Sequence, residues 1–172
     1  MIDFGLGVIL EPLDTGIKEK IRSWRNDRDI FIWCRQKTLI SDLEQEAWFN
    51  SQAHDPTIKM FAVSNKQKTS VGVCGFTSID HFNRRAEFSL YIAKEHQKHG
   101  YGAEALRVLF NHGFLDLGFN CIWGETFEGN PATKTFEKIG MKREGTRRQF
   151  YFKNGKMIDA HIYSVLGSEW TL

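Results

Sequence analysis

Hydrophobic residues alternate with polar ones, or run together, in five separate stretches of the chain, as is typical of β-strands. These stretches are residues 6–13, 59–64, 70–79, 85–93 and 121–127. Short polar segments separate the middle three stretches, so we expect an antiparallel meander there. A last alternating region, residues 147–166, contains Asn154-Gly155 and predicts a hairpin closed by a type I′ turn.

Apolar residues recur with the period of an α-helix in four other stretches. These are residues 14–27, 40–52, 101–117 and 130–140. The second opens with Ser41 and Glu44, the spacing of a capping box, in which each side chain accepts the other residue's backbone N–H. We expect Leu43, Ala47 and Trp48 to form the buried face of this helix. The succession of strands and helices predicts an α+β fold, with residues 1–172 forming a single domain.

The composition is that of an ordinary globular domain. Hydrophobic residues make up 41% and charged residues 26% of the 172 positions, and the net charge is 23 − 21 = +2. So balanced a charge gives no reason to expect nucleic acid as a partner. We expect no membrane association either, since no run approaches the ~20 apolar residues of a span and the start is unlike a signal peptide. The three cysteines are widely spaced without metal-ligand motifs, which indicates reduced thiols in a cytoplasmic protein and no metal site.

Residues 97–103, QKHGYGA, combine two glycines with the predicted start of a helix. Gly100 and Gly102 allow the backbone to approach an anion closely, and the helix start adds its positive end, so this pattern predicts a phosphate-binding segment. The GxxxxGK[ST] loop of nucleoside triphosphatases is absent. The letters GYGAEA do match the dinucleotide fingerprint, but the polar stretch KEHQKH stands where that fingerprint requires a strand. A dinucleotide-binding protein therefore stays as an alternative.

The same segment resembles the signature of a known enzyme superfamily. Gln97-x-x-Gly100-x-Gly102 is similar to the [QR]-x-x-G-x-[GA] motif of the GNAT superfamily of acetyl-CoA-dependent N-acetyltransferases. Three longer blocks resemble the branch containing ribosomal-protein N-terminal acetyltransferases: AEFSLYIAKEHQKHGYGAEAL, GNPATKTFEKIGMKREGTRR and NGKMIDAHIYSVLGSEW. The resemblance implies a mixed, mostly antiparallel central sheet with splayed middle strands, flanked by helices. It also implies acetyl-CoA as co-substrate without a metal, and it leaves a homodimer open.

The resemblance assigns the coenzyme to the predicted phosphate-binding segment and to the strand before it. The backbone of residues 97–103 would hold the pyrophosphate of coenzyme A, and the preceding strand would line its pantetheine arm. The implied coenzyme-binding residues are Leu90, Tyr91, Ile92, Gln97, Lys98, His99, Gly100, Tyr101, Gly102, Ala103, Asn130 and Phe136. At Phe136 the chain departs from the family pattern, because many relatives carry there a tyrosine that protonates the leaving thiolate.

Two glutamates are the candidates for proton transfer. Glu125, in WGETF, occupies the position that resembles the base of the ribosomal-protein branch, and Glu87, in AEFSL, matches an acidic position that faces the acceptor. Either carboxylate could take the proton of an amine, directly or through a water. The alternative for each is a purely structural pairing with an arginine at the mouth of the site.

The implied function is acetyl transfer to a primary amine by direct attack, and the acceptor stays open between two classes. One is a small molecule such as a nucleotide-linked amino sugar, because the segment from Trp24 to Phe49 resembles relatives of that kind and supplies Arg25, Arg28 and Arg35 for an anion. The other is a protein N-terminal amine, such as that of a ribosomal protein. A non-catalytic acyl-CoA-binding module remains an alternative, in view of the missing tyrosine.

Overall fold

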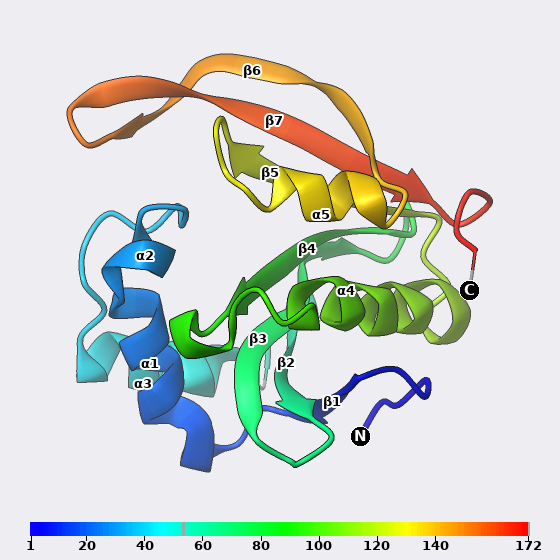
Figure 1. Cartoon of the computed structure of the whole chain (residues 1–172), viewed down its shortest axis with the longest axis horizontal. Coiled ribbons are helices and arrows are strands. Elements are labelled where there is room, and N and C mark those ends of the chain that lie inside the picture. Colours follow the sequence, from blue (N-terminus) through cyan, green and yellow to red (C-terminus); the bar gives the residue numbers. More distant parts are fainter. Residues whose placement is uncertain (53, 172) are drawn as a thin grey trace.

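The computed structural model describes residues 1–52 and 54–171, and its centre is a seven-stranded sheet (Figure 1). The strands are β1 (Val8–Pro12), β2 (Lys59–Asn65), β3 (Ser70–Asp80), β4 (Arg85–Ile92), β5 (Cys121–Phe127), β6 (Lys142–Lys153) and β7 (Lys156–Leu166). They lie in the order β1-β2-β3-β4-β5-β7-β6, and every neighbouring pair is antiparallel except β4 and β5. The predicted mixed, mostly antiparallel sheet is confirmed.

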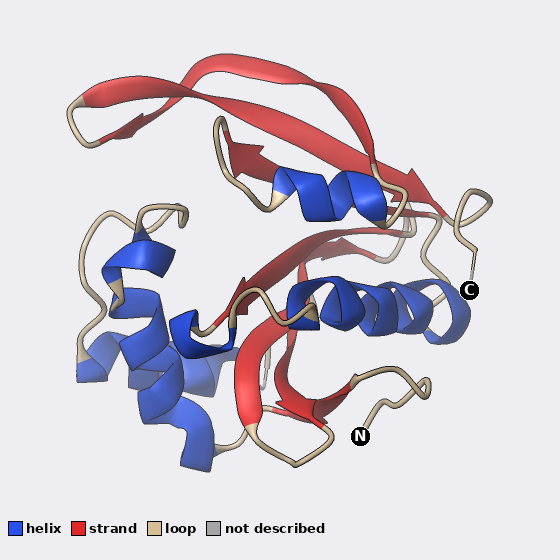
Figure 2. Cartoon of the chain, in the orientation of Figure 1, coloured by secondary structure: helices blue, strands red, loops and turns tan. Residues whose placement is uncertain are grey.

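Helices cover both faces of this sheet (Figure 2). They are α1 (Lys18–Asn26), α2 (Arg28–Phe31), α3 (Asp42–Gln52), α4 (Tyr101–Asn111) and α5 (Thr133–Lys138). Leu106 and Phe110 of α4 pack with Phe76 on one face, while Ile21 of α1 packs with Val73 on the other. Successive strand residues point to opposite faces, so β3 contributes to both cores. None of the helices in the described part of the chain has both the length and the apolar character needed to span a bilayer.

The predicted elements occur in the predicted order, with small departures. The short helix α2 is an addition, and the residue before it, Asp27, caps it by accepting the N–H of Asp29 at 2.8 Å. The hairpin of β6 and β7 turns at Asn154 and Gly155, with φ of +52° and +76°, so the type I′ prediction is confirmed. Strand β6 begins earlier than predicted, at Lys142, and α4 gives way to a π-helical turn at His112–Asp116.

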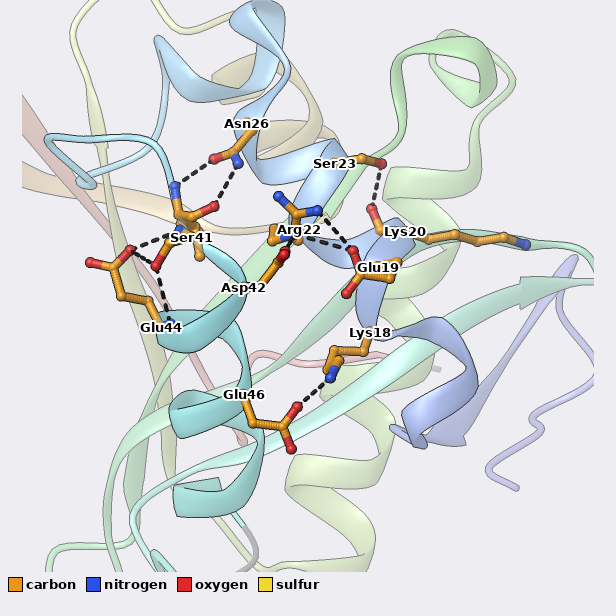
Figure 3. Close-up of polar contacts among 11 residues, drawn as sticks. Lys18, Glu19, Lys20, Arg22, Ser23, Asn26, Ser41, Asp42, Glu44 and Glu46 are labelled. Carbon is orange, nitrogen blue, oxygen red and sulfur yellow. Dashed lines mark hydrogen bonds and ion pairs between the residues drawn. The ribbon is translucent and has the colours of Figure 1, made fainter.

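The capping box at the start of α3 is confirmed, but the predicted buried face of this helix is wrong. Ser41 donates its backbone N–H to Glu44 Oε2 at 2.8 Å, and Glu44 donates its own to Ser41 Oγ at 3.3 Å (Figure 3). Leu43, however, is 83% exposed and Ala47 is exposed too, whereas Gln45 is only 2% exposed. Of the predicted stripe, only Trp48 is half-buried.

Ion pairs between α1 and α3 explain which face of α3 turns inward. Arg22 Nε lies 2.7 Å from Asp42 Oδ1, and Lys18 pairs with Glu46 one turn further along (Figure 3). Residues three and four apart share a helix face, so the position between these two pairs, Gln45, is also directed toward α1. Hydrophobic periodicity alone does not predict this polar contact between helices.

Strands β4 and β5 pair only at one end and then diverge. Their parallel pairing joins Arg85–Glu87 to Cys121–Trp123 and stops there. Directly beyond it, the ring of Phe88 lies against the backbone of Gly124, where a Cβ would come within 2.3 Å of Phe88 Cε1. Glycine leaves room for the ring, and the ring fills the start of the gap between the strands. The predicted splaying of the middle strands is confirmed.

Candidate active site

A cavity of about 310 Å³, which we call the central cavity, opens where β4 and β5 diverge. Its walls come from these two strands, from the loop between α2 and α3, and from the segment leading into α5. Six of the predicted site residues line it together: Glu87, Leu90, Tyr91, Glu125, Asn130 and Phe136. The fold thus assembles in one place residues that the sequence pointed to in three separate blocks.

Two buried carboxylates face the central cavity from the two diverging strands. The side chain of Glu87 is 6% exposed and that of Glu125 is 3% exposed. Arg35 bridges them, with Nη2 2.7 Å from Glu87 Oε1 and Nη1 3.5 Å from Glu125 Oε1. Burial lowers the pKa of Arg35, but the two glutamates and Tyr151 outweigh it, and the pKa is raised overall. The guanidinium therefore stays charged between the carboxylates.

Glu125 is held more tightly than Glu87. Arg147 Nη1 donates to Glu125 Oε2 at 2.9 Å, and the hydroxyl of Tyr151 donates to Glu125 Oε1. Burial, and then this hydrogen bond, raise the pKa of Tyr151 above its ordinary value. Apart from Arg35, the side-chain donors to Glu87 among the described residues are the hydroxyls of Thr77 and Ser78, each 3.5 Å from Oε2. An incoming amine would thus find freer lone pairs on Glu87 than on Glu125.

Tyr151 is the site residue that the sequence analysis misses. Its stretch, QFYFK, shows only the alternation of a hairpin strand, and no motif marks the tyrosine. Tyr151 lies on β6, and β7 separates β6 from β5 in the sheet. Its hydroxyl nevertheless reaches Glu125 of β5, because the hairpin of β6 and β7 curves (Figure 1). The sequence marks Arg147 only as part of the basic pair Arg147-Arg148, and such pairs are common on solvated protein surfaces.

Residues 97–100 form a loop and residues 101–103 form the first turn of α4, so the predicted helix start at this glycine pattern is confirmed. The helix begins at Tyr101, and Gly100 before it has a φ of +86°, in the left-handed region that favours glycine. Gln97 Nε2 donates to the carbonyl of Ile92 at 3.0 Å, which ties the loop to the end of β4. A Cβ at Gly102 would meet side chains of β4 at 3.7 Å, an ordinary contact that agrees with the Gly or Ala of the motif. The first amides of an α-helix have no partner within the helix, and such a helix start is able to bind a phosphate.

The other residues of this loop are exposed or partly exposed. The ring of His99 stacks on that of Tyr101, with centroids 6.0 Å apart, and Lys98 has a φ of +65°. Ile92 is not among the residues that line the central cavity; its side chain, like that of Leu90, lies beside Gly102. Residues 93–100 separate β4 from α4, whereas a dinucleotide fingerprint follows its strand directly. Within residues 1–52 and 54–171, no group of three His, Cys, Asp or Glu side chains is placed to hold a metal.

Asn130 and Phe136 have structural contacts of their own at the cavity wall. Asn130 Oδ1 accepts the N–H of Ala132 at 2.9 Å, so part of its hydrogen-bonding capacity serves the turn before α5. Phe136 is 6% exposed and packs edge-on against Phe88, with centroids 5.1 Å apart. Its ring offers no proton to a leaving group, and the hydroxyl of Tyr163 behind it donates to Glu137.

Comparison with known proteins agrees with this geometry. A family model described as an acetyltransferase (GNAT) domain matches residues 8–142. The chain is 28% identical to spermidine N(1)-acetyltransferase of Vibrio cholerae over 162 residues, which cover 94% of each protein. It is also 34% identical over 102 residues to a putative ribosomal N-acetyltransferase, YdaF, of Bacillus subtilis, covering 57% of this chain and 56% of that one.

A solved structure shares the whole architecture. The crystal structure of spermidine N-acetyltransferase from Vibrio cholerae, in complex with CoA and spermine, superposes with a TM-score of 0.90 at 27% identity. The match covers 95% of this chain and 97% of that one. The chain therefore belongs to the GNAT acetyltransferase family, and it is an acetyl-CoA-dependent N-acetyltransferase.

Proposed function

We propose that the acceptor is a primary amine of a small molecule, which attacks the thioester directly in the central cavity. One observation carries this proposal: Glu87 and Glu125 face the same cavity from the two diverging strands, with the cation of Arg35 between them. A guanidinium already occupies the space between the carboxylates, so the same oxygens suit the ammonium of an acceptor. The acceptor would displace Arg35, whose side chain is 50% exposed and free to move into solvent.

The chemistry asks three things of these residues. The amine must lose a proton before it attacks, since an alkylammonium has a pKa of ~10.4. We assign this proton to Glu87 or Glu125, directly or through a water, a step worth ~10²–10⁴-fold in rate. A backbone N–H of Leu90, Tyr91 or Ile92 would polarise the thioester carbonyl, at ~2.7–4 kcal/mol. As the C–N bond forms, the C–S bond breaks, and the thiolate, whose thiol has a pKa of ~8.5, leaves without help from Phe136.

The relatives favour a small molecule over a protein N-terminus. The spermidine acetyltransferase matches 94% of this chain, including the α1–α3 region that borders the acceptor side of the cavity. The putative ribosomal acetyltransferase matches only 57%. A polyamine is therefore a second candidate acceptor beside the amino sugar that the arginines suggest. The free thiols of Cys34, Cys74 and Cys121 suit a reducing compartment, which supports a cytoplasmic enzyme.

The test is thiol release from acetyl-CoA with a panel of amines, measured on the wild type and on isosteric variants. We expect Glu87→Gln or Glu125→Gln, whichever removes the proton acceptor, to lower kcat at least tenfold. Glu128→Gln is the matched control, since Glu128 is exposed at the end of β5 and lies outside the cavity. Calorimetric titration with acetyl-CoA should give the same affinity for all four proteins.

The outcomes separate the enzyme from the non-catalytic alternative. A binding module would hold acetyl-CoA and release no thiol with any amine, and its two glutamine variants would behave like the wild type. Release that is unchanged in both Glu87→Gln and Glu125→Gln would leave the enzyme but remove these glutamates from its mechanism.

A further inference from the structure

A second cavity, of about 290 Å³, adjoins the central cavity between α1 and α3. Three residues line both cavities and form the partition between them: Arg25, Gln36 and Trp48. The remaining wall of the second cavity is partly apolar, with Ile21 of α1 and Ile40 before α3. The two cavities are therefore adjacent, and a molecule whose amine lies at the carboxylates of the central cavity would pass Arg25 to reach the second cavity.

The groups around this partition are hydrogen-bond donors that lack acceptors. Gln45 lines the second cavity, is 2% exposed, and its Nε2 has no hydrogen-bond partner among the described residues. Tyr91 lines the central cavity, and its buried hydroxyl likewise has no partner in the described part of the chain. A buried donor without an acceptor costs about 1–3 kcal/mol, so two of them at connected cavities point to a ligand that accepts.

Arg25 adds a positive charge to these donors, and the structure holds it in place. Its Nε donates to Gln36 Oε1 at 2.8 Å, and Gln36 Nε2 donates back to the carbonyl of Arg25 at 3.0 Å. Its guanidinium carbon lies 5.7 Å from the centre of the Tyr91 ring. Unlike Arg35, Arg25 forms no ion pair with any carboxylate of residues 1–52 and 54–171. Its two terminal nitrogens are thus available for an anion.

Of the described residues that line the second cavity, Glu44 alone is acidic, and it is engaged in capping α3. Its Oε2 accepts both the backbone N–H and the hydroxyl of Ser41, each at 2.8 Å (Figure 3). The second cavity therefore offers a ligand the guanidinium of Arg25 and the side-chain amide of Gln45, unpaired in the described chain, as donors. Its carboxylate, that of Glu44, already accepts two hydrogen bonds. Such a site matches a carboxylate or a phosphate better than a further cation.

We propose that the second cavity is a subsite for an anionic group of the acceptor, a carboxylate or a phosphate, bound by Arg25 and Gln45. The acceptor then carries a primary amine at one end and an anion at the other. This inference rests on the proposed function, because it takes the amine to lie between Glu87 and Glu125. An anionic group distinguishes this acceptor from a polyamine, whose second ammonium would be repelled by the guanidinium of Arg25.

The experiment compares amines that differ only in the anion. Lysine against cadaverine tests a carboxylate, and glucosamine 6-phosphate against glucosamine tests a phosphate, each titrated calorimetrically into the CoA-saturated protein. We expect the anionic member of at least one pair to bind about 10- to 100-fold more tightly to the wild type, as one charge-assisted contact provides. In Arg25→Gln the preference should disappear. Arg28→Gln, which removes an exposed charge outside both cavities, should keep it.

A second variant guards against a folding defect in Arg25→Gln. Gln45→Leu keeps the side-chain volume and removes the orphan amide, so it should fold at least as stably and still lose part of the preference, about three- to tenfold. The inference is overturned if neither anionic amine binds more tightly than its partner, or if Arg25→Gln retains the preference.

Thiol release with the same four amines keeps the two proposals apart. An anion preference in binding, without thiol release from acetyl-CoA by any of these amines, would support the subsite and contradict the proposed function. Thiol release with cadaverine or glucosamine, and no anion preference in binding, would support the proposed function and overturn the subsite.

Discussion

The contact between Phe88 and Gly124 gives a quantitative test of how the two middle strands are held apart. A methyl group at position 124 would lie 2.3, 2.7 and 3.0 Å from three atoms of the Phe88 ring, and from nothing else as close. Gly124→Ala should therefore lower the free energy of unfolding by about 1–3 kcal/mol, the usual range for overpacking. Phe88→Ala removes a ring that is 8% exposed and packs on Phe110 and Phe136, so it should lower the free energy by about 3–5 kcal/mol.

The double variant is the decisive member of this set. Once the Phe88 ring is gone, the methyl group of Gly124→Ala meets open space, so its cost should vanish. It should even turn into a gain of up to about 1 kcal/mol, since glycine weakens a strand relative to alanine. The two changes should therefore be non-additive, with a coupling of about 1–4 kcal/mol. Gly145→Ala in β6 is the control, because a Cβ there meets nothing within 4 Å.

Urea unfolding, extrapolated linearly to water, measures all five proteins, and calorimetry with CoA reports the function of the gap. Gly124→Ala should weaken CoA binding as well as stability, because the displaced ring enters the space between the strands. Additive losses in the double variant would refute the account of the Phe88 ring as the filler of this gap. So would a loss in Gly124→Ala no larger than that in Gly145→Ala.

Three further predictions concern the site and its surroundings. Arg35→Gln should lower the free energy of unfolding by about 1–3 kcal/mol in urea, because it leaves Glu87 and Glu125 facing each other without their shared cation. Tyr151 has a raised pKa in the folded protein, so its contribution to stability is full below its ordinary pKa of ~10 and is lost as the pH rises through the folded value. Chemical unfolding at a series of pH values should accordingly show a smaller alkaline fall in Tyr151→Phe than in the wild type. Asn130→Ala should cost about 1 kcal/mol by removing the acceptor of a turn amide, and Asn130→Asp should restore it; equal stability of the two variants would contradict the turn-capping role.

The sequence carries most of the fold because the signals that place its elements are local. The alternation of strands, the Asn154-Gly155 turn and the Ser41 and Glu44 capping box each depend on neighbours within a few residues, and all three are found in the structure. The buried face of α3 depends instead on ion pairs with another helix, to Lys18 and Arg22. No pattern within the helix contains that information.

In the candidate site, too, the features marked by local sequence are predictable and those that depend on distant contacts are not. Glu87 and Glu125 stand in recognisable blocks, so their meeting at the central cavity is predictable, and the glycines of the loop before α4 place that loop at the helix start. The bridging of the two carboxylates by Arg35 and the contact from Tyr151 join positions far apart in the chain, and they depend on the course of the α2–α3 loop and on the curvature of the long hairpin. The second cavity is likewise set by how α3 sits on α1, which the sequence did not predict correctly.

The most direct test of the whole account follows the acetyl group itself. The protein is incubated with isotopically labelled acetyl-CoA and the amine that gives the fastest thiol release, and both the amine and the protein are analysed by mass spectrometry during turnover. Direct attack predicts the label on the nitrogen of the amine, in step with thiol release, and no labelled protein at any time. Label that accumulates on the protein, or thiol release without a labelled amine, would contradict the account.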